Sequence, residues 1–292
     1  MRKTFINTLT NIARKDKNIW LLTADMGFSV LENFFQEFSD RTINTGIAEQ
    51  NAMAIAAGLA LAGKKVYVYS IAPFVTLRCL EQIKNDVCYM NTDVKIIGIG
   101  GGLCYGSAGA THHSIEDIGV MRVLPNIKVY APMDTLELKG IIEQTYLTKS
   151  PTYIRIGNKT CENFTEIPFN IDKARVLFSG EDSAIIFTGD IADQALIFAE
   201  QLRNKNKKPY LISMPSLKPI DEELIKYLVG KNIEIYSLEE HNIYGGLASA
   251  LSEIIAQTGK VVKFTPFAVP DKFSHYVGDR NFLRKKMNIG FN

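Results

Sequence analysis

The sequence predicts an α/β protein made of two doubly wound domains with mainly parallel sheets. Short apolar or β-branched runs, each ending in a turn or a small residue, alternate with longer segments of helical pattern. Strand–helix–strand alternation favours parallel pairing with helices on both faces of a sheet. The length of 292 residues suits two domains of ordinary size.

The first half carries the clearer alternation of strands and helices. Its predicted strands are residues 19–24, 41–46, 65–71, 94–100, 127–132 and 152–157. Helical patterns lie between them at 48–62, 76–90 and 135–146. The first of these helices stops at Gly63, and glycine favours the end of a helix.

The second half repeats the pattern with different spacing. Its predicted strands are residues 183–189, 209–214, 233–240 and 260–266, and its helices are 193–202 and 245–257. A polar segment without clear period separates the halves. We therefore expect a first domain at 1–160, a linker at 161–175 and a second domain at 176–292.

Composition and charge indicate an ordinary globular protein. The formal net charge is +2 and the charges are spread along the chain, which gives no indication of nucleic-acid binding. The one basic cluster, Arg284 to Lys286, is predicted to be a solvated helix face. The N-terminal segment is polar and amphipathic, and no apolar run approaches the ~20 residues of a membrane span. Neither a signal peptide nor a membrane contact is expected.

The cysteines favour a reducing compartment. They are Cys79, Cys88, Cys104 and Cys161, with no CxxC pair and no zinc-finger spacing. We expect reduced thiols in a cytoplasmic protein.

Three loops are predicted to form the functional site. In open parallel sheets, ligands gather at the carboxyl ends of strands, where loops turn into helices. Loops 45–51, 69–74 and 100–114 carry unusual residues at such ends. Within the first loop, Glu49 by its position alone is typical of an acidic residue that suits the first turn of a helix.

Three segments together resemble the pyrimidine-binding domain of the transketolase family of thiamine diphosphate enzymes. They are GIAEQNAMAIAAGLALAGKKVYVYS (46–70), GATHHSIEDIGVMRVLPNIKVYAPMD (109–134) and YIRIGN (153–158), in the order and spacing of the family. The resemblance is strong from residue 1 to about 160. It continues weakly in SLKPID (216–221) and EEHNIYGGLASAL (239–251).

The resemblance implies that Glu49 activates thiamine diphosphate. A carboxyl group bonded to N1′ of the aminopyrimidine stabilises the imino tautomer, whose 4′-nitrogen removes the proton from the thiazolium C2. Such a carboxyl group needs a dry site. Glu49 is expected to be buried among Ala and Ile side chains, where it serves as both a catalytic and a cofactor-binding residue.

The resemblance assigns further roles in the other two loops. Phe74 is expected to stack on the aminopyrimidine, although the loop differs from the family pattern by about two residues and a core Phe is the alternative. His112 matches the histidine of the family's GPTH motif and is expected to bind the donor carbonyl or shuttle a proton, with a structural histidine as the alternative. His113 replaces a Gln common in the family and is a second expected substrate ligand.

Two further residues complete the expected site. Arg155 matches a family arginine that binds the substrate phosphate, for which its planar fork is suited, and a surface salt bridge is the alternative. Asp25 matches an acidic residue near the thiazolium side of the cofactor.

One family motif is missing. The Mg-diphosphate motif begins Gly-Asp-Gly and ends with paired Asn, and the pairs Gly189–Asp190 and Gly278–Asp279 lack that context. This chain is therefore expected to supply no metal ligand, with Mg²⁺ and the diphosphate held by a separate N-terminal transketolase subunit in an α2β2 assembly. The start at Met1 with a plausible first helix suits such a subunit boundary.

The substrate loop also departs from the family. Gly100 to Gly102 stand where relatives carry a phosphate ligand, and Ala108 replaces the acidic residue that reads the donor hydroxyls. These losses weaken the case for ordinary pentose phosphates and leave an atypical ketose or a nucleotide-linked sugar open. A phosphate cradle in this Gly-rich run is the alternative to a flexible substrate loop, but it lacks a Rossmann context and a Walker Lys.

The expected reaction is transfer of a two-carbon ketol unit from a ketose to an aldehyde. The alternatives are the E1 β subunit of a 2-oxo acid dehydrogenase, a deoxyxylulose-phosphate-synthase-like enzyme and a non-catalytic scaffold. Reactivity with pyruvate or with hydroxypyruvate separates the E1 reaction from the transketolase reaction. The C-terminal domain, including His241, is expected to serve packing and self-association only.

Overall fold

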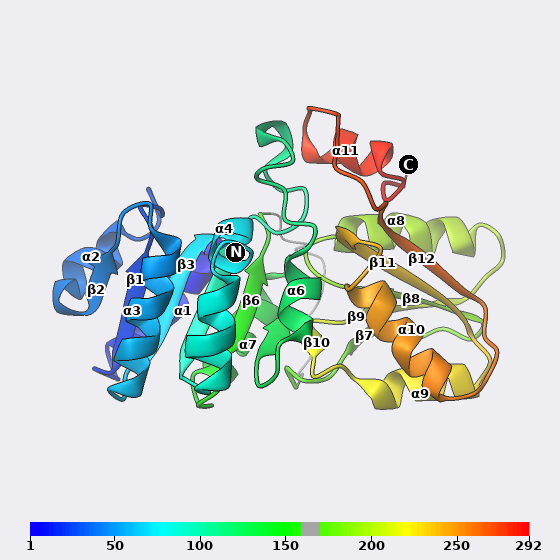
Figure 1. Cartoon of the computed structure of the whole chain (residues 1–292). Coiled ribbons are helices and arrows are strands. Elements are labelled where there is room, and N and C mark those ends of the chain that lie inside the picture. Colours follow the sequence, from blue (N-terminus) through cyan, green and yellow to red (C-terminus); the bar gives the residue numbers. More distant parts are fainter. Residues whose placement is uncertain (159–169, 292) are drawn as a thin grey trace.

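Two mainly parallel sheets lie beside each other, each covered by helices on both faces (Figure 1). The structure is a computed structural model that describes residues 1–158 and 170–291. Neighbouring strands are parallel except for one antiparallel pair at an edge of each sheet. The predicted fold class is confirmed.

The spatial order of the strands in each sheet differs from their order in the sequence. The seven-stranded sheet, in spatial order, is β10 (Ser216–Lys218), β5 (Lys128–Tyr130), β6 (Thr152–Ile156), β4 (Val94–Ile99), β3 (Lys65–Ile71), β1 (Ile19–Thr23) and β2 (Thr42–Asn44). The five-stranded sheet is β12 (Phe264–Val269), β11 (Glu234–Asn242), β8 (Ser183–Phe187), β9 (Pro209–Ser213) and β7 (Arg175–Phe178).

The helices connect these strands. The first domain has α1 (Arg2–Ala13), α2 (Glu32–Glu37), η1 (Ser39–Arg41), α3 (Glu49–Leu61), α4 (Ala72–Thr76), α5 (Leu80–Gln82), η2 (Ile83–Tyr89), η3 (Gly106–Ala108), α6 (Asp117–Val123) and α7 (Thr135–Thr145). The second has α8 (Ala192–Arg203), α9 (Glu222–Gly230), α10 (Leu247–Gln257) and α11 (Arg280–Lys286). In the described part of the chain, no helix is long and apolar enough to cross a membrane.

Strand β3 shows how the first sheet separates two cores. Its successive side chains point to opposite faces, as the period of a strand requires. Val66 and Val68 belong to the core on the α3 face. Tyr67 and Tyr69 belong to the core on the α1 face, where the ring of Phe5 stacks on Tyr69 with centroids 5.6 Å apart.

Two predicted elements differ from the structure. The helix expected at 76–90 is not continuous: α4 ends at Thr76, and α5 and the π-type η2 follow only from Leu80. The chain turns between α4 and α5, so Arg78 lies outside a helix. The strand expected at 260–266 begins instead at Phe264, where pairing with Ile235 starts. Val261 is 95% exposed and contributes nothing to the sheet.

The second half of the chain completes the first sheet. Strand β10 pairs antiparallel with β5, with Ser216 opposite Tyr130. The linker predicted at 161–175 lies mostly on residues 159–169, outside the described residues, and its last residue, Arg175, already begins β7. The sheets are therefore joined by more than a linker.

The prediction for the basic cluster near the C-terminus is half wrong. Arg284 lies on a helix, as expected, but its side chain is 1% exposed and pairs with Glu240 and Asp193. Lys285 and Lys286 are exposed. The helical period turns Arg284 inward, where acidic partners from other elements compensate its charge.

Candidate active site

Glu49 opens helix α3 at the carboxyl end of β2. The residue is 3% exposed, so it lies in the dry environment that the sequence predicts. Its Oε2 accepts a hydrogen bond of 2.6 Å from Arg78. A buried carboxylate normally needs such a partner, because its own desolvation is costly.

Arg78 is a member of this site that the sequence reasoning missed. Its guanidinium carbon lies 4.5 Å from the centroid of the Phe74 ring while the same group donates to Glu49. The side chain is 44% exposed, so it covers the site from the solvent side. Its position four residues after Phe74, just beyond the end of α4, is the signal that was available in the sequence.

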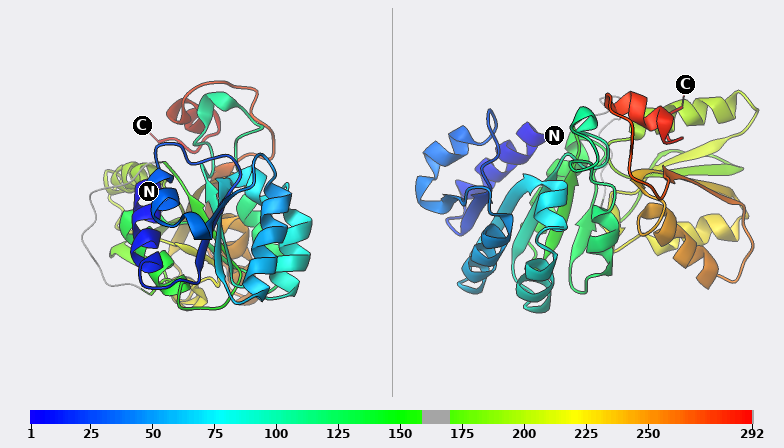
Figure 2. Two further views of the ribbon diagram at one scale, coloured as in Figure 1. Left: turned by 90° about the vertical axis from the view of Figure 1, so that its left-hand side faces the viewer. Right: turned by 45° about the horizontal axis from the view of Figure 1, so that its top comes forward.

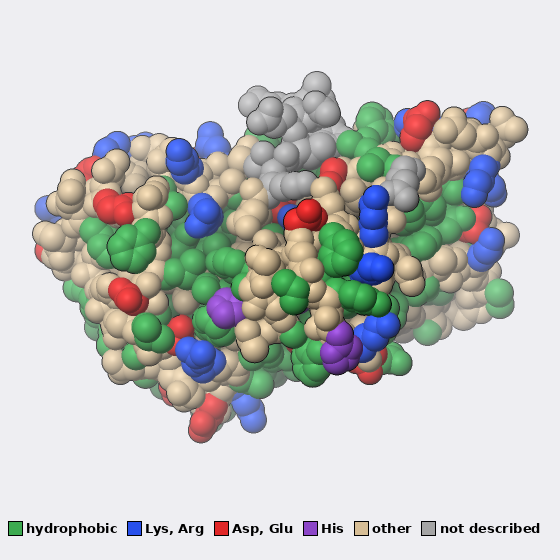
Figure 3. Space-filling view, turned by 90° about the horizontal axis from the view of Figure 1, so that it is seen from above, with side chains coloured by type: hydrophobic (Ala, Val, Ile, Leu, Met, Phe, Trp, Pro, Cys, Tyr) green, Lys and Arg blue, Asp and Glu red, His purple; other side chains and the backbone are tan. Residues whose placement is uncertain are grey.

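His112 completes the group from the third loop. Its ring contacts Phe74 edge-on, with centroids 5.3 Å apart and planes at 70°. Its Nδ1 lies 3.0 Å from the hydroxyl of Thr111. Three predicted residues, Glu49, Phe74 and His112, thus meet through direct contacts or through Arg78. Figure 3 looks down on this face, where histidine side chains reach the surface among hydrophobic and basic ones.

His113 points away from this group. It is 4% exposed, and its Nε2 lies 2.9 Å from the carbonyl oxygen of Gly106. Because a carbonyl only accepts, Nε2 carries the proton. The structure therefore gives His113 a role in shaping its own loop, and the expected contact with substrate stays a prediction.

Arg155 is likewise used inside the fold. It is 5% exposed, its Nε lies 3.0 Å from Asp117, and its NH2 donates to the carbonyl oxygens of Ser114 at 2.6 Å and Glu240 at 2.8 Å. Burial lowers the pKa of Arg155, but Asp117 and other acidic neighbours outweigh it, so the net pKa is raised. Arg155 bridges the two domains, so it is not a surface salt bridge, and its role as a phosphate ligand stays a prediction.

Asp25 lies in its expected place at the carboxyl end of β1. It is exposed, has a left-handed φ of 49°, and its N–H donates to Asn44 at 2.9 Å. A hollow of about 400 Å³ lies beside it, lined also by Met26, Phe28 and Phe35. No contact among the described residues joins Asp25 to Glu49, so its cofactor role stays a prediction.

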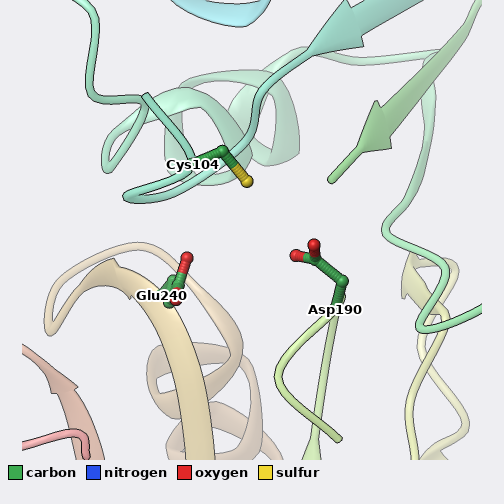
Figure 4. A group of neighbouring side chains, drawn as sticks. All are labelled: Cys104, Asp190 and Glu240. Carbon is green, nitrogen blue, oxygen red and sulfur yellow. The ribbon is translucent and has the colours of Figure 1, made fainter. Parts of the chain in front are cut away.

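A cluster of possible metal ligands lies between the domains. Cys104, Asp190 and Glu240 offer atoms within 4.8 Å of one another and face a common space from three segments (Figure 4). The positive charge of Arg280 compensates the two carboxylates, with hydrogen bonds of 2.7 Å to Asp190 and 2.8 Å to Glu240. Burial raises the pKa of Cys104 to about 12, so its thiol is protonated when no metal is bound. The cluster is a charge-paired network.

The buried His241 is expected to make the stability of the chain depend on pH. The N–H of Gly119 donates to its Nε2 at 3.1 Å, so the proton sits on Nδ1, 2.8 Å from the carbonyl oxygen of Asn242. Burial lowers the pKa of His241 to about 4. The unfolded chain therefore binds this proton first, and stability is lost as the pH falls from about 6.5 to 4. The loss approaches about 3 kcal/mol at pH 4.

The measurement compares wild type with His241→Gln by thermal unfolding from pH 7.5 to 4. We expect the midpoint of wild type to fall more steeply with acid than that of the variant, since other titrating groups are common to both. His275→Gln, at an exposed position, is the matched control. Parallel curves for wild type and His241→Gln would show that His241 does not titrate in this range.

Two family models match the chain. The model described as "Transketolase, pyrimidine binding domain" matches residues 1–161, and "Transketolase, C-terminal domain" matches residues 172–282. The chain belongs to the transketolase family. The transketolase resemblance carried by the loop sequences is thereby confirmed.

Several relatives of this transketolase chain are named as transketolase subunits. It is 35% identical over 298 residues to an apulose-4-phosphate transketolase subunit of Phocaeicola vulgatus, with 97% of this chain and 95% of that protein covered. It is 31% identical over 292 residues to a 6-deoxy-6-sulfo-D-fructose transketolase subunit of Clostridium sp., with 99% and 90% covered. A solved structure described as a split-gene transketolase, inactive β4 tetramer, matches with a TM-score of 0.90 and 32% identity, covering 99% and 93%.

Proposed function

We propose that this transketolase chain is the C-terminal subunit of a split enzyme that transfers a two-carbon ketol unit from a ketose to an aldehyde. Thiamine diphosphate binds at the interface with an N-terminal subunit. The observation that carries the proposal is the convergence of the buried Glu49 carboxylate, the Phe74 ring and His112 at the carboxyl ends of the first sheet.

The place taken by Arg78 fits an aminopyrimidine. The guanidinium is a flat group that stacks on Phe74 at 4.5 Å and donates to Glu49 at 2.6 Å. An aminopyrimidine has the same two features, a flat face for the aromatic ring and a ring nitrogen for the carboxyl group. Because the Arg78 side chain is 44% exposed, it has room to turn into solvent when the cofactor ring takes these contacts.

The residues of this chain have separate tasks in the reaction. When bound, thiamine diphosphate supplies the nucleophilic thiazolium carbon that accepts the ketol unit. Glu49 holds a proton at the pyrimidine N1′, and its burial keeps water from competing for that proton. Phe74 fixes the plane of the ring. His112, whose Nδ1 contacts Thr111, presents Nε2 to the donor oxygen and moves a proton there.

Exposed hydrophobic side chains next to the site support the proposal that a partner chain binds there. Phe28, Ile47 and Leu77 are 82%, 80% and 39% exposed, and each lies in or beside a loop at the carboxyl ends of β1, β2 or β3. Exposed apolar side chains at one end of a sheet are typical of an interface. We assign this surface to the N-terminal subunit, which supplies the ligands of Mg²⁺ and the diphosphate in an α2β2 assembly.

The cellular compartment and the substrate follow from the same proposal. Cys79, Cys88 and Cys104 are free thiols, which suits the cytoplasm, while Cys161 lies outside the described residues. The donor is a ketose other than an ordinary pentose phosphate. This choice rests on Gly100 to Gly102 and Ala108 at the positions of family ligands, and on the internal use of Arg155.

The test is calorimetric titration of thiamine diphosphate with Mg²⁺. It is run on this chain alone and on this chain mixed with its N-terminal subunit, and the mixture is then assayed with hydroxypyruvate and with pyruvate. We expect tight binding only in the mixture, and turnover of hydroxypyruvate. Tight binding by the lone chain would reveal a diphosphate site here and end the two-subunit proposal, and turnover of pyruvate alone would favour the E1-type reaction.

A further inference from the structure

The loop that carries His112 is tied at its base to the second domain. Residues 100–114, here called the histidine loop, are closed where Gly102 and Ser114 each donate an N–H to the other's carbonyl oxygen at 2.9 Å. Leu103 then enters the hydrophobic core of the second domain, where it is 1% exposed. Strand β4 precedes the loop and α6 follows it, and the second domain supplies the support beneath it.

Glu240, near the end of β11, is the central contact of that support. It is 3% exposed, and its Oε2 accepts the N–H of Leu103 at 3.0 Å. A Cβ on Gly102 would lie 2.4 Å from the same oxygen, and the φ of Gly102 is +67°. Only glycine suits both the backbone and the space beside the carboxylate. The histidine loop is therefore shaped to sit on Glu240.

Two arginines of α11 fix the Glu240 carboxylate. Arg280 donates through Nε to Oε1 and through NH2 to Oε2, both at 2.8 Å, and its NH1 donates to Asp190 at 2.7 Å. Arg284 donates to Oε1 from the next turn of the helix. Burial raises the pKa of Glu240, but the two guanidinium groups outweigh burial and hold it far below the ordinary value. The carboxylate therefore stays charged and its geometry is fixed by forked hydrogen bonds.

The tip of the histidine loop rests on the segment that leads into α11. A Cβ on Gly106 would lie 2.8 Å from the carbonyl oxygen of Gly278, so the two backbones are in close contact. The carbonyl oxygen of Gly106 in turn accepts a hydrogen bond from His113, the neighbour of His112. Figures 1 and 2 show the loop and α11 next to each other from different directions.

We propose that the second domain positions His112 for the ketol transfer, with Glu240 and Arg280 as the positioning residues. This inference rests on the proposed function. The support reaches both the base and the tip of the histidine loop, while Glu49 and Phe74 come from other loops. Loss of the support should therefore displace His112 and leave the aminopyrimidine contacts intact. A displacement of about 1 Å in a positioned group costs up to about 100-fold in rate.

The experiment uses the chain assembled with its N-terminal subunit and compares Arg280→Met, Arg280→Lys and the control Arg203→Met. Arg203 is an arginine of the same domain whose side chain is 43% exposed. For Arg280→Met we expect kcat with hydroxypyruvate and glycolaldehyde to fall about 10- to 100-fold while the Kd of thiamine diphosphate changes less than about threefold. Arg280→Lys should recover part of the rate, and Arg203→Met should match wild type.

Hydrogen exchange supplies a readout that does not depend on turnover. In Arg280→Met, the amides of Gly102, Leu103 and Ser114 should exchange faster, while those of α3 keep their wild-type protection. Gly102→Ala is the second variant, because it displaces the loop from Glu240 without removing a charge. It should reproduce the loss of rate, and it decides the outcome if Arg280→Met does not assemble.

Unchanged kcat and unchanged loop exchange in a folded variant would overturn the positioning role. A loss of cofactor affinity in step with the loss of rate would overturn it as well, since the support would then serve the whole site. Failure of the proposed function is seen separately, because the wild-type assembly would then neither bind thiamine diphosphate nor convert hydroxypyruvate.

Discussion

Replacing Glu49 by Gln should lower the ketol-transfer rate of the assembled enzyme by about 10²- to 10⁴-fold, the range of proton-transfer catalysis by a positioned side chain. Glutamine keeps the size of the side chain but does not hold the N1′ proton. The rate is measured with hydroxypyruvate as donor. Exchange of the thiazolium C2 proton with deuterated solvent, followed by NMR, should slow in parallel because Glu49 acts before the donor reacts.

Glu143→Gln is the matched control for this change. Glu143 is an acidic residue of α7 in the same domain, with a side chain that is 51% exposed and far from the site loops in sequence. It should leave both the rate and the C2 exchange unchanged. If Glu49→Gln, assembled with its partner, were as active as wild type, Glu49 would have no part in activating the cofactor.

Replacing Arg155 by Met should destabilise the chain by about 3–5 kcal/mol, because it leaves the buried Asp117 carboxylate without its cation. Asp117 is 0% exposed and also accepts a hydrogen bond from Tyr153 at 2.5 Å. The change also removes the bonds from Arg155 to Ser114 and Glu240, which join the domains. Thermal and urea unfolding of the isolated chain measure the loss.

The double variant Asp117→Asn with Arg155→Met separates charge from packing. It should be less destabilised than the sum of the single changes, since neither charge is then left alone in the interior. The contrary result would be an Arg155→Met protein as stable as wild type with a raised KM for phosphorylated donors alone. Arg155 would then be the phosphate ligand that the family resemblance implied.

The strands and the site loops could be predicted from local sequence. The run from Lys65 to Ile71 has the length and β-branched content of a buried strand, and β3 has those bounds. The rule that parallel strands bring their carboxyl ends to one edge predicted the three loops. Glu49, Phe74 and His112 within them were identified through the resemblance to the transketolase family. The divided helix after Phe74 was missed, since the apolar period continues through a turn that tertiary contacts impose.

The sequence by itself therefore determined the two-sheet architecture, the family and the three loops that meet at Glu49, because all of these follow from short-range periodicity and from contiguous motifs. Only the tertiary structure decided the roles of the arginines. Arg78 turns toward Glu49, Arg155 bridges the domains, and Arg284 of α11 is buried against Glu240. An arginine is buried only where a distant segment supplies a carboxylate to compensate its charge. Arg284 and Glu240 are 44 residues apart, so no local sequence pattern reveals that they pair.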